Sequence, residues 1–316
     1  MSLPLVFELA AFIFGLLLGS FLNVCIVRLP FHESIVKPRS RCPRCLHTLS
    51  WYDNIPLLSW INLRAHCRHC RASIPWRYPL VEFSVAVWFV IIAHRIVQAA
   101  VFISAANVTM PVRIDMGVGG GTYLLATLIM GFLLIGLLVM DWQTSTLPDA
   151  FTLSGIVVGI FLIAVQALFL APDEAAIHLD TAHNLRMSSP GSFIDRGNVF
   201  LTGPEHLLLG RVAAVMGAAL IPLIIRWIYK LVRGQQGMGL GDAKLMAMIG
   251  AFLGFWPAVV AFVLGCFLIF PYAVTLLLRK RANRSSELPF GSFLAAGGLL
   301  TALIGPALLD WYRSFL

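Results

Sequence analysis

The stretch TYLLATLIMGFLLIGLLVMD, residues 122–141, contains nineteen uncharged residues followed by one aspartate. About 20 apolar residues in a helix cross the ~30 Å hydrocarbon core of a bilayer. The stretch therefore predicts a membrane-spanning helix over 122–140, with Asp141 at its edge. A carboxylate at a membrane boundary carries a desolvation cost, which makes it a candidate for a functional role. A second aspartate, Asp242, closes the glycine-rich stretch GMGLGD at 237–242 and directly precedes another apolar run.

The composition extends this interpretation to the whole chain. Of its 316 residues, 59% are apolar and 12% are charged, and the mean hydropathy is +0.86. Soluble domains carry about 25% charged residues, so a soluble fold is excluded. We predict an all-α, polytopic integral membrane protein with about eight transmembrane helices. The predicted spans are 5–27, 79–99, 122–140, 150–171, 206–229, 243–256, 257–278 and 288–309.

Two of these spans need comment. No Lys or Arg precedes Arg28, so the first span lacks the basic region of a signal peptide and is expected to remain as a membrane helix. The sixth span is short because Trp256-Pro257 interrupts what would otherwise be one long apolar segment.

The formal net charge of +8 is distributed in a way that indicates topology and not nucleic-acid binding. The segment 28–77 holds nine basic residues against two acidic ones, and basic residues also cluster in 279–287 and around the turn 230–244. The segment 172–205 is net acidic. The positive-inside rule places the three basic segments in the cytoplasm and 172–205 outside, with both termini outside. Both aspartates then lie on the cytoplasmic side.

Three regions follow along the chain. Residues 5–99 form an N-terminal helix pair that encloses the cytoplasmic loop 28–77. Residues 120–278 carry both aspartates and include the external insertion 172–205. Residues 279–316 form a basic cytoplasmic turn and the last helix. Gly15 and Gly19 in the first helix are spaced for close helix packing, which we interpret as packing within the chain.

The loop 28–77 contains two Cys-x2-Cys pairs, Cys42/Cys45 and Cys67/Cys70, separated by 21 residues. Four thiolates so spaced close a tetrahedron around Zn²⁺, which predicts a structural zinc site without an open position for catalysis. Two disulfides are the alternative, but disulfides rarely persist in the cytoplasm. Three nearby histidines are interpreted as surface polar residues and not as ligands: His47, His66 and His69.

Two aspartates on one membrane face are the minimum for an aspartyl protease. Two carboxyls that share a site hold one proton between them, so the ionised one can activate water while the protonated one polarises a peptide carbonyl. Each aspartate also has a simpler interpretation. Asp141 alone fits a solvated carboxylate at the interface, and Asp242 fits a helix N-cap for a segment that starts at Ala243. Asp149, which follows Pro148, is interpreted as an N-cap.

The combination of these motifs resembles the type IV prepilin peptidases of bacterial pilus and type II secretion systems. The resemblance covers most of the chain and rests on seven motifs: Gly19-Ser-Phe-Leu-Asn-Val24, Pro38-Arg-Ser-Arg-Cys-Pro-Arg-Cys45, Asp53-Asn-Ile-Pro-Leu-Leu-Ser-Trp60, Cys67-Arg-His-Cys70, Arg77-Tyr-Pro-Leu-Val-Glu82, Gly237-Met-Gly-Leu-Gly-Asp-Ala-Lys-Leu245 and Pro289-Phe-Gly-Ser-Phe-Leu-Ala295, together with the segment that starts at Asp141.

The resemblance implies that Asp141 and Asp242 are catalytic and that Cys42, Cys45, Cys67 and Cys70 bind zinc. It implies cleavage of the basic leader from prepilin or pseudopilin precursors at the inner membrane of a bacterium. It also implies N-methylation of the new N-terminal residue with S-adenosylmethionine, for which the chain shows no glycine-rich fingerprint. The resemblance defines no oligomeric state. In this chain the two aspartates are 101 positions apart, a longer separation than the family pattern, with the excess in 172–205.

Three other classes of function remain open at this stage. An ion-coupled transporter would carry its carboxylates deep within spans, whereas both aspartates here lie at the ends of spans. A zinc metalloprotease would need an open coordination position, and the sequence contains no His-Glu-x-x-His. An assembly subunit without chemistry would carry the aspartates as interfacial residues only.

Overall fold

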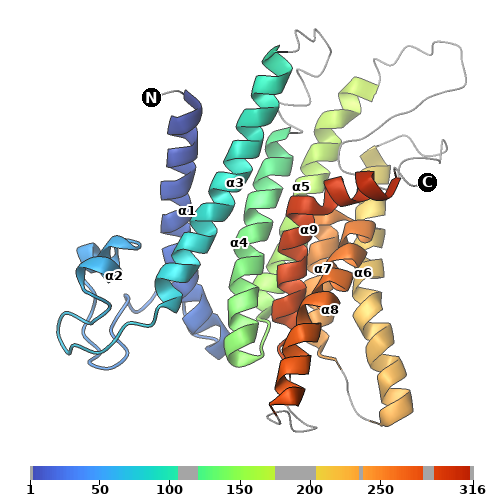
Figure 1. The fold of residues 1–316 in the computed structure, drawn as a ribbon. Coiled ribbons are helices and arrows are strands. Elements are labelled where there is room, and N and C mark those ends of the chain that lie inside the picture. The colour runs from blue at the N-terminus through green and yellow to red at the C-terminus, as the bar shows by residue number, and fades with distance from the viewer. Residues whose placement is uncertain (1–2, 106–119, 175–203, 235–237, 280–287, 314–316) are drawn as a thin grey trace, which may run out of the picture. The chain divides into compact units, whose positions relative to one another are not determined.

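The computed structural model describes residues 3–105, 120–174, 204–234, 238–279 and 288–313, in which every regular element is a helix. It divides into two compact units, residues 1–110 and 111–316 (Figure 1). The predicted insertion 172–205 and basic turn 279–287 lie almost wholly outside the described residues. The division of the chain into three functional regions therefore remains a prediction.

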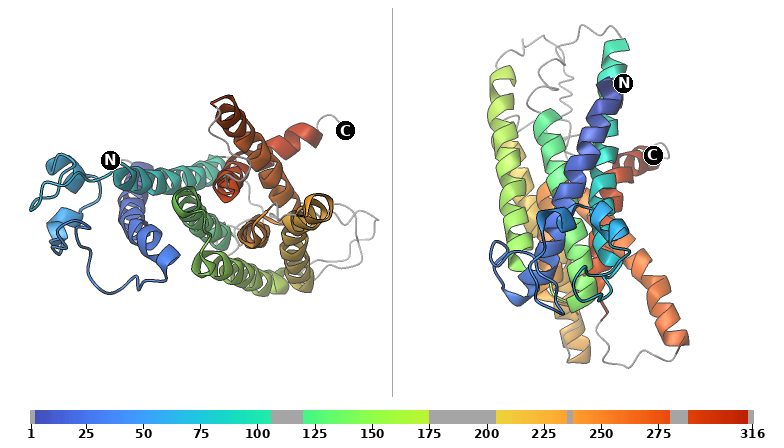
Figure 2. Two further views of the ribbon diagram at one scale, coloured as in Figure 1. Left: turned by 90° about the horizontal axis from the view of Figure 1, so that it is seen from below. Right: turned by 90° about the vertical axis from the view of Figure 1, so that its left-hand side faces the viewer.

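The first unit consists of two long helices and the loop between them. Helices α1 (Leu3–Arg28) and α3 (Arg77–Ala105) pack side by side along their length (Figures 1 and 2). A Cβ atom on Gly15 or Gly19 would lie 2.6 Å from the Cα atom of Ala86 or Glu82, so only glycine permits this approach. The predicted packing role of these two glycines within the chain is confirmed.

The loop between α1 and α3 contains only short helices among its described residues. These are η1 (Leu29–Phe31), η2 (Trp51–Asn54) and α2 (Leu58–Asn62). With so little regular structure the loop buries few apolar side chains, which fits a segment whose fold depends on a metal.

The second unit contains six helices, α4 (Gly120–Thr144), α5 (Asp149–Glu174), α6 (Pro204–Arg233), α7 (Leu240–Leu253), α8 (Phe255–Leu278) and α9 (Phe290–Arg313). Helix α7 contacts each of the other five helices (Figure 2). Ten of its fourteen residues are buried, from Asp242 to Phe252. The core of this unit is therefore built around the helix that carries Asp242.

All eight predicted spans coincide with helices, but the described residues contain only six helices that are long and apolar enough to cross a membrane. These six are α1, α3, α4, α5, α6 and α8. Helix α7, with 14 residues, is about 21 Å long and falls short of the ~30 Å core. The apolar part of α9, Phe290–Gly305, is also short. The protein is a multi-pass membrane protein, and the number of eight spans remains a prediction.

The break between α7 and α8 lies at Gly254, slightly before the predicted interruption at Trp256-Pro257. Gly254 has a φ of 91°, a left-handed conformation that other residues rarely adopt. Pro257 falls within the first turn of α8, where its missing N–H costs no helical hydrogen bond. Glycine therefore ends the first helix, and the following proline is tolerated at the start of the next.

Candidate active site and metal centre

Asp141 lies one turn before the end of α4 and is only 5% exposed. Its Oδ2 atom accepts hydrogen bonds from the backbone N–H of Ser292, over 2.6 Å, and from the Ser292 hydroxyl, over 3.0 Å. Ser292 lies in the first turn of α9, where backbone N–H groups have no partner within the helix. A Cβ atom on Gly291 would lie 3.0 Å from the Asp141 carboxyl carbon. The start of α9 thus forms a cradle for Asp141, which is not the solvated carboxylate of the simpler interpretation.

Asp242 lies in the first turn of α7 and is 8% exposed. The simpler interpretation of Asp242 as an N-cap is wrong, because α7 begins at Leu240 and its N-cap is Gly239. Asp242 is the third helical residue, and its Oδ2 atom accepts a hydrogen bond of 3.2 Å from the Gly239 N–H. The helix dipole also favours a negative charge at this position. One carboxyl oxygen is thereby held while the other stays available for chemistry.

The fold brings the two aspartates together although they are 101 positions apart. Burial, together with the charge of the nearby Asp141, raises the pKa of Asp242 to about 6. Leu147 links the two surroundings, since its side chain lies against both Gly241, which precedes Asp242, and Gly291, which lies against Asp141. The charge of Asp141 therefore acts on Asp242, which is the arrangement expected of two carboxyls that share a proton.

The glycines before Asp242 differ in what surrounds them. Around Gly239 a Cβ atom would meet only the Asp242 carboxylate, at 3.5 Å, and the Gly241 nitrogen, at 3.8 Å. Gly241 is covered by Leu147, at 3.0 Å. Gly237 lies outside the described residues. The backbone of this stretch is therefore uncrowded at Gly239.

Asp149 has a different environment from the other two aspartates. It is the first residue of α5, so the predicted N-cap position falls one residue earlier, at Pro148, whose carbonyl accepts the first helical hydrogen bond from Thr152. The Asp149 carboxylate instead pairs with Lys244 over 2.5 Å, and both side chains are substantially exposed. Exposed pairs of this kind contribute about 0–1 kcal/mol to stability.

The four cysteines of the loop converge in the first unit. Their sulfur atoms all lie within 4.8 Å of one another, and Cys42 Sγ is 3.8 Å from Cys70 Sγ. Four sulfurs placed tetrahedrally about 2.3 Å from a zinc ion are about 3.8 Å apart. All six cysteines of the chain are free, so the disulfide alternative is not supported. The donor set fits a tetrahedral metal ion.

Both Cys-x2-Cys turns have the same backbone conformation. The N–H of Cys42 donates to His47 O, and that of Leu46 donates back to Cys42 O. Cys67 repeats this pattern with the carbonyl of Ala72 and the N–H of Arg71. Leu46 and Arg71 share a φ of 57°. The turns are thus preformed for metal binding.

The three histidines near the cysteines are exposed, as predicted, and none joins the group of sulfur ligands. The rings of His47 and His69 lie 3.6 Å apart, outside the cysteine cluster. The site therefore uses cysteine ligands alone.

Sequence reasoning assigned no role to Ser292, although the motif Pro289–Ala295 contains it. The sequence did contain one signal for Ser292: it is a small polar residue that directly follows a Phe-Gly pair at the start of a helix. Glu82 also had no predicted role. It is the only acidic residue in the predicted span 79–99 and is 8% exposed.

Comparison with known proteins places the chain in one family. Residues 13–96 match the bacterial peptidase A24 N-terminal domain, and residues 197–274 match the type IV leader peptidase family. A prepilin leader peptidase/N-methyltransferase of Aeromonas salmonicida (strain A449) is 30% identical over 338 residues, which cover 99% of this chain and 96% of that protein. No solved structure matches this chain significantly.

Two further relatives carry the same name. The protein of Myxococcus xanthus (strain DK1622) is 35% identical over 262 residues, covering 82% of this chain and 59% of its own length. The protein of Burkholderia pseudomallei (strain 1026b) is 31% identical over 332 residues, covering 96% of this chain and 88% of its own length. The chain belongs to the type IV leader peptidase family, and this membership favours the peptidase interpretation over the transporter.

Proposed function

We propose that this protein is a membrane-embedded aspartyl endopeptidase that removes the leader peptide from type IV prepilins or pseudopilins. It then methylates the new N-terminal amine, with S-adenosylmethionine as the methyl donor. The names of its relatives support both activities. The observation that carries the peptidase activity is the burial of Asp141 and Asp242 on α4 and α7, with the charge of Asp141 acting on Asp242.

The pair performs acid–base chemistry on one peptide bond. The ionised carboxyl removes a proton from a water molecule, whose oxygen attacks the carbonyl carbon, while the protonated carboxyl donates to the carbonyl oxygen. The tetrahedral intermediate then breaks its C–N bond, and the leaving amine takes a proton from the pair. The proton belongs to the two carboxyls together and not to one residue.

The surrounding residues fix the reacting atoms. Ser292 holds Asp141 by one oxygen, and the Gly239 N–H does the same for Asp242. This leaves the second oxygen of each carboxyl for the reacting groups. The open backbone at Gly239 suits an extended substrate that approaches beside Asp242.

The two other groups have separate tasks. Zn²⁺ held by Cys42, Cys45, Cys67 and Cys70 would have all four positions filled by protein, so its role is to fold the loop. S-adenosylmethionine supplies an electrophilic methyl group when it is bound. Neither group takes part in peptide hydrolysis, which needs only the two carboxyls and water.

Ser292 is expected to position Asp141. Ser292→Ala removes the hydroxyl donor but keeps the backbone N–H, and it should lower kcat for cleavage about tenfold with little change in KM, because a hydrogen bond to a charged group contributes roughly 1.5–3 kcal/mol. Ser292→Thr should restore most of the rate. Ser154→Ala, which removes a hydroxyl bonded to Ala150 on α5, is the control and should leave the rate unchanged. Equal kcat for Ser292→Ala and wild type would reject this role.

The membrane orientation follows from the basic residues of 28–77 and 230–244, which we assign to the cytoplasmic side of a bacterial inner membrane. Single cysteines at Arg233 and at Ser188 are expected to react with a membrane-impermeant maleimide from opposite sides, after accessible native thiols have been blocked. Position 233 should label only in inverted vesicles and position 188 only in whole spheroplasts. Labelling of position 188 from the cytoplasmic side alone would contradict the orientation.

The order of the two reactions tests the proposed function as a whole. Purified enzyme and a prepilin-like peptide without S-adenosylmethionine should yield the cleaved, unmethylated product, since hydrolysis does not consume the donor. Addition of the donor should then increase the product mass by one methylene equivalent, because the free amine exists only after cleavage. Mass spectrometry of the products gives both results. If no cleaved peptide accumulates without the donor, the proposed order is wrong.

A further inference from the structure

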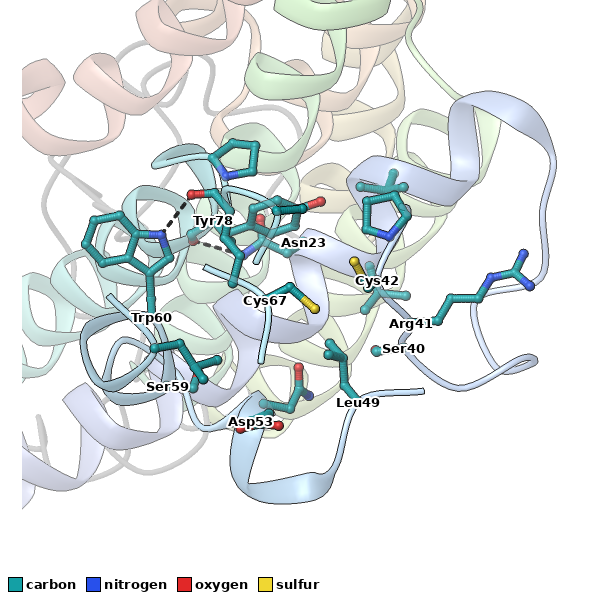
Figure 3. Close-up of a pocket in the computed structure, with 18 of the residues that line it drawn as sticks. Asn23, Ser40, Arg41, Cys42, Leu49, Asp53, Ser59, Trp60, Cys67 and Tyr78 are labelled. Carbon is teal, nitrogen blue, oxygen red and sulfur yellow. Dashed lines mark hydrogen bonds between the residues drawn. The ribbon is translucent and has the colours of Figure 1, made fainter. Parts of the chain in front are cut away.

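Asp242 is held by groups that belong to the second unit. Its Oδ2 atom accepts the Gly239 N–H over 3.2 Å, and the charge that acts on it is that of Asp141. The cavity of about 680 Å³ beside the tetracysteine loop is lined by residues 20–82 of the first unit alone (Figure 3). Neither Gly239 nor Asp141 belongs to that lining, so the fixing of Asp242 is a property of α7 and the helices packed against it.

Arg226 on α6 differs from the basic residues that follow it. Lys230 and Arg233 lie in the last turn of α6 and are exposed, which suits basic residues at the end of a span. Arg226 lies about one turn before Lys230, and it is half-buried although residues 224–225 and 227–234 are all exposed. A charged side chain that is drawn away from solvent at the edge of an apolar helix is costly, which favours a functional role.

The Arg226 guanidinium holds the peptide group that precedes α7. Its Nη1 atom donates to Met238 O over 3.1 Å. The same peptide group contains the Gly239 N–H, which donates to Asp242 Oδ2. In a trans peptide the C=O and the N–H point in opposite directions, so Arg226 and Asp242 hold this peptide group from its two sides. Fixing the direction of the carbonyl therefore also fixes the direction of the N–H that reaches Asp242.

The guanidinium also strengthens the hydrogen bond from Gly239. A cation at the carbonyl oxygen draws electron density from the amide N–H, and hydrogen bonds that run through one peptide group reinforce each other. Gly239 has no side chain that could restrict its own backbone, and a Cβ atom there would meet only the Asp242 carboxylate and the Gly241 nitrogen. The surroundings of Gly239 therefore do little to orient this peptide group, and the bond from Arg226 does.

A second arginine of α6 holds the other end of α7. Arg211 Nη1 donates to Phe252 O in the last turn of α7, also over 3.1 Å. The two arginines are 15 positions apart, which is about 22 Å along a helix. Helix α6 thus brackets α7 at both ends, but only Arg226 bonds to the peptide group beside Asp242.

We propose that Arg226 is a positioning residue of the aspartate pair, acting on Asp242 through the peptide group between Met238 and Gly239. This inference rests on the proposed function, because it gives Arg226 a task in peptide hydrolysis. Arg226 itself transfers no proton. It keeps the Gly239 N–H on one oxygen of Asp242, which leaves the other oxygen for the reacting groups and stabilises the ionised form of the pair.

Arg226→Met tests this role, because methionine keeps an unbranched apolar side chain and removes the guanidinium. For cleavage of a prepilin-like peptide, kcat should fall about tenfold with little change in KM, the loss expected for one charge-assisted hydrogen bond. The acid limb of the pH profile of kcat should move to higher pH, since a weaker hydrogen bond to the ionised carboxyl raises the pKa of the pair. Arg226→Lys keeps a positive donor and should recover most of the rate.

Arg211→Met is the matched control. It removes the same kind of hydrogen bond, of the same length and from the same helix, at the far end of α7. Both variants should lower the melting temperature, but Arg211→Met should leave the acid limb at the wild-type pH. The other charges near the start of α7, those of Asp141 and of the Asp149–Lys244 pair, are the same in every variant.

The outcomes separate this role from the proposed function. A wild-type kcat and acid limb in Arg226→Met would overturn the role, as would an equal shift of the acid limb in Arg211→Met. If Arg226→Met does not fold, Arg226→Gln, which keeps a neutral N–H donor, should show a smaller shift in the same direction, and its absence would also overturn the role. In each case a wild type that cleaves the peptide, and an Asp242→Asn variant that does not, would leave the proposed function intact. A wild type without cleavage would end both.

Discussion

Asp242→Asn and Asp141→Asn are each expected to lower the rate of leader cleavage by about 10³-fold or more. An amide can neither take a proton from water nor share the proton of the pair, and general acid–base catalysis contributes about 10²–10⁴-fold. Asparagine has nearly the same shape as aspartate, so it should still accept the hydrogen bonds from Ser292 and Gly239. The measurement is the initial rate of cleavage of a prepilin-like peptide under saturating conditions.

Asp149→Asn is the matched control for both substitutions. Asp149 lies on the same unit and pairs with Lys244 at the start of α7, yet it is exposed and its loss removes only a surface ion pair. Cleavage by this variant should stay within about twofold of wild type, since such pairs contribute at most ~1 kcal/mol. A variant at Asp242 that melts at the wild-type temperature and still cleaves at the wild-type rate would remove the basis of the mechanism.

Cys67→Ser is expected to abolish stoichiometric metal binding. The wild type should contain one zinc ion per chain, and the variant should contain well below that, because three thiolates with one hydroxyl form a much weaker site. Since metal binding and folding of such a loop are coupled, limited proteolysis should cut the variant within residues 40–75. Zinc content is measured by elemental analysis of protein purified in metal-replete medium.

Cys266→Ser provides the comparison for this result. Cys266 lies on α8, far along the chain from the cluster, and it is not part of the group of four. Its replacement should leave both zinc content and the proteolysis pattern unchanged. Wild-type protein that carries no stoichiometric zinc would show that the four sulfurs serve another purpose.

Much of this architecture could be predicted from the types of single residues and their spacing along the chain. Apolar runs predicted the positions of the eight long helices that the described residues contain, since burial in lipid favours apolar side chains. The spacing of Cys42, Cys45, Cys67 and Cys70 predicted their convergence, which the structure confirms. The two aspartates stood out because charge is rare in such runs, and both are buried in the second unit. Their catalytic role remains a prediction.

The parts that could not be predicted depend on contacts between distant segments. Helix α7 is buried on all sides, so its sequence has no polar face that would distinguish a short core helix from a membrane span. Ser292 lies 151 positions from Asp141, and nothing local links them. The alternative interpretation of Asp242 as an N-cap fails because Gly239 takes that position, and a capping glycine has no side chain that would mark it in the sequence. Asp149 likewise pairs with a lysine 95 positions away.

The central claim is that Asp141 and Asp242 act as one catalytic unit. The most direct test compares the residual cleavage rate of Asp141→Asn/Asp242→Asn with the rates of the two single variants. If the carboxyls share one proton and one water molecule, the second substitution removes nothing further, and the double variant should retain the rate of the slower single variant. A double variant whose loss equals the product of the two single losses would show that the aspartates act independently and would contradict the account.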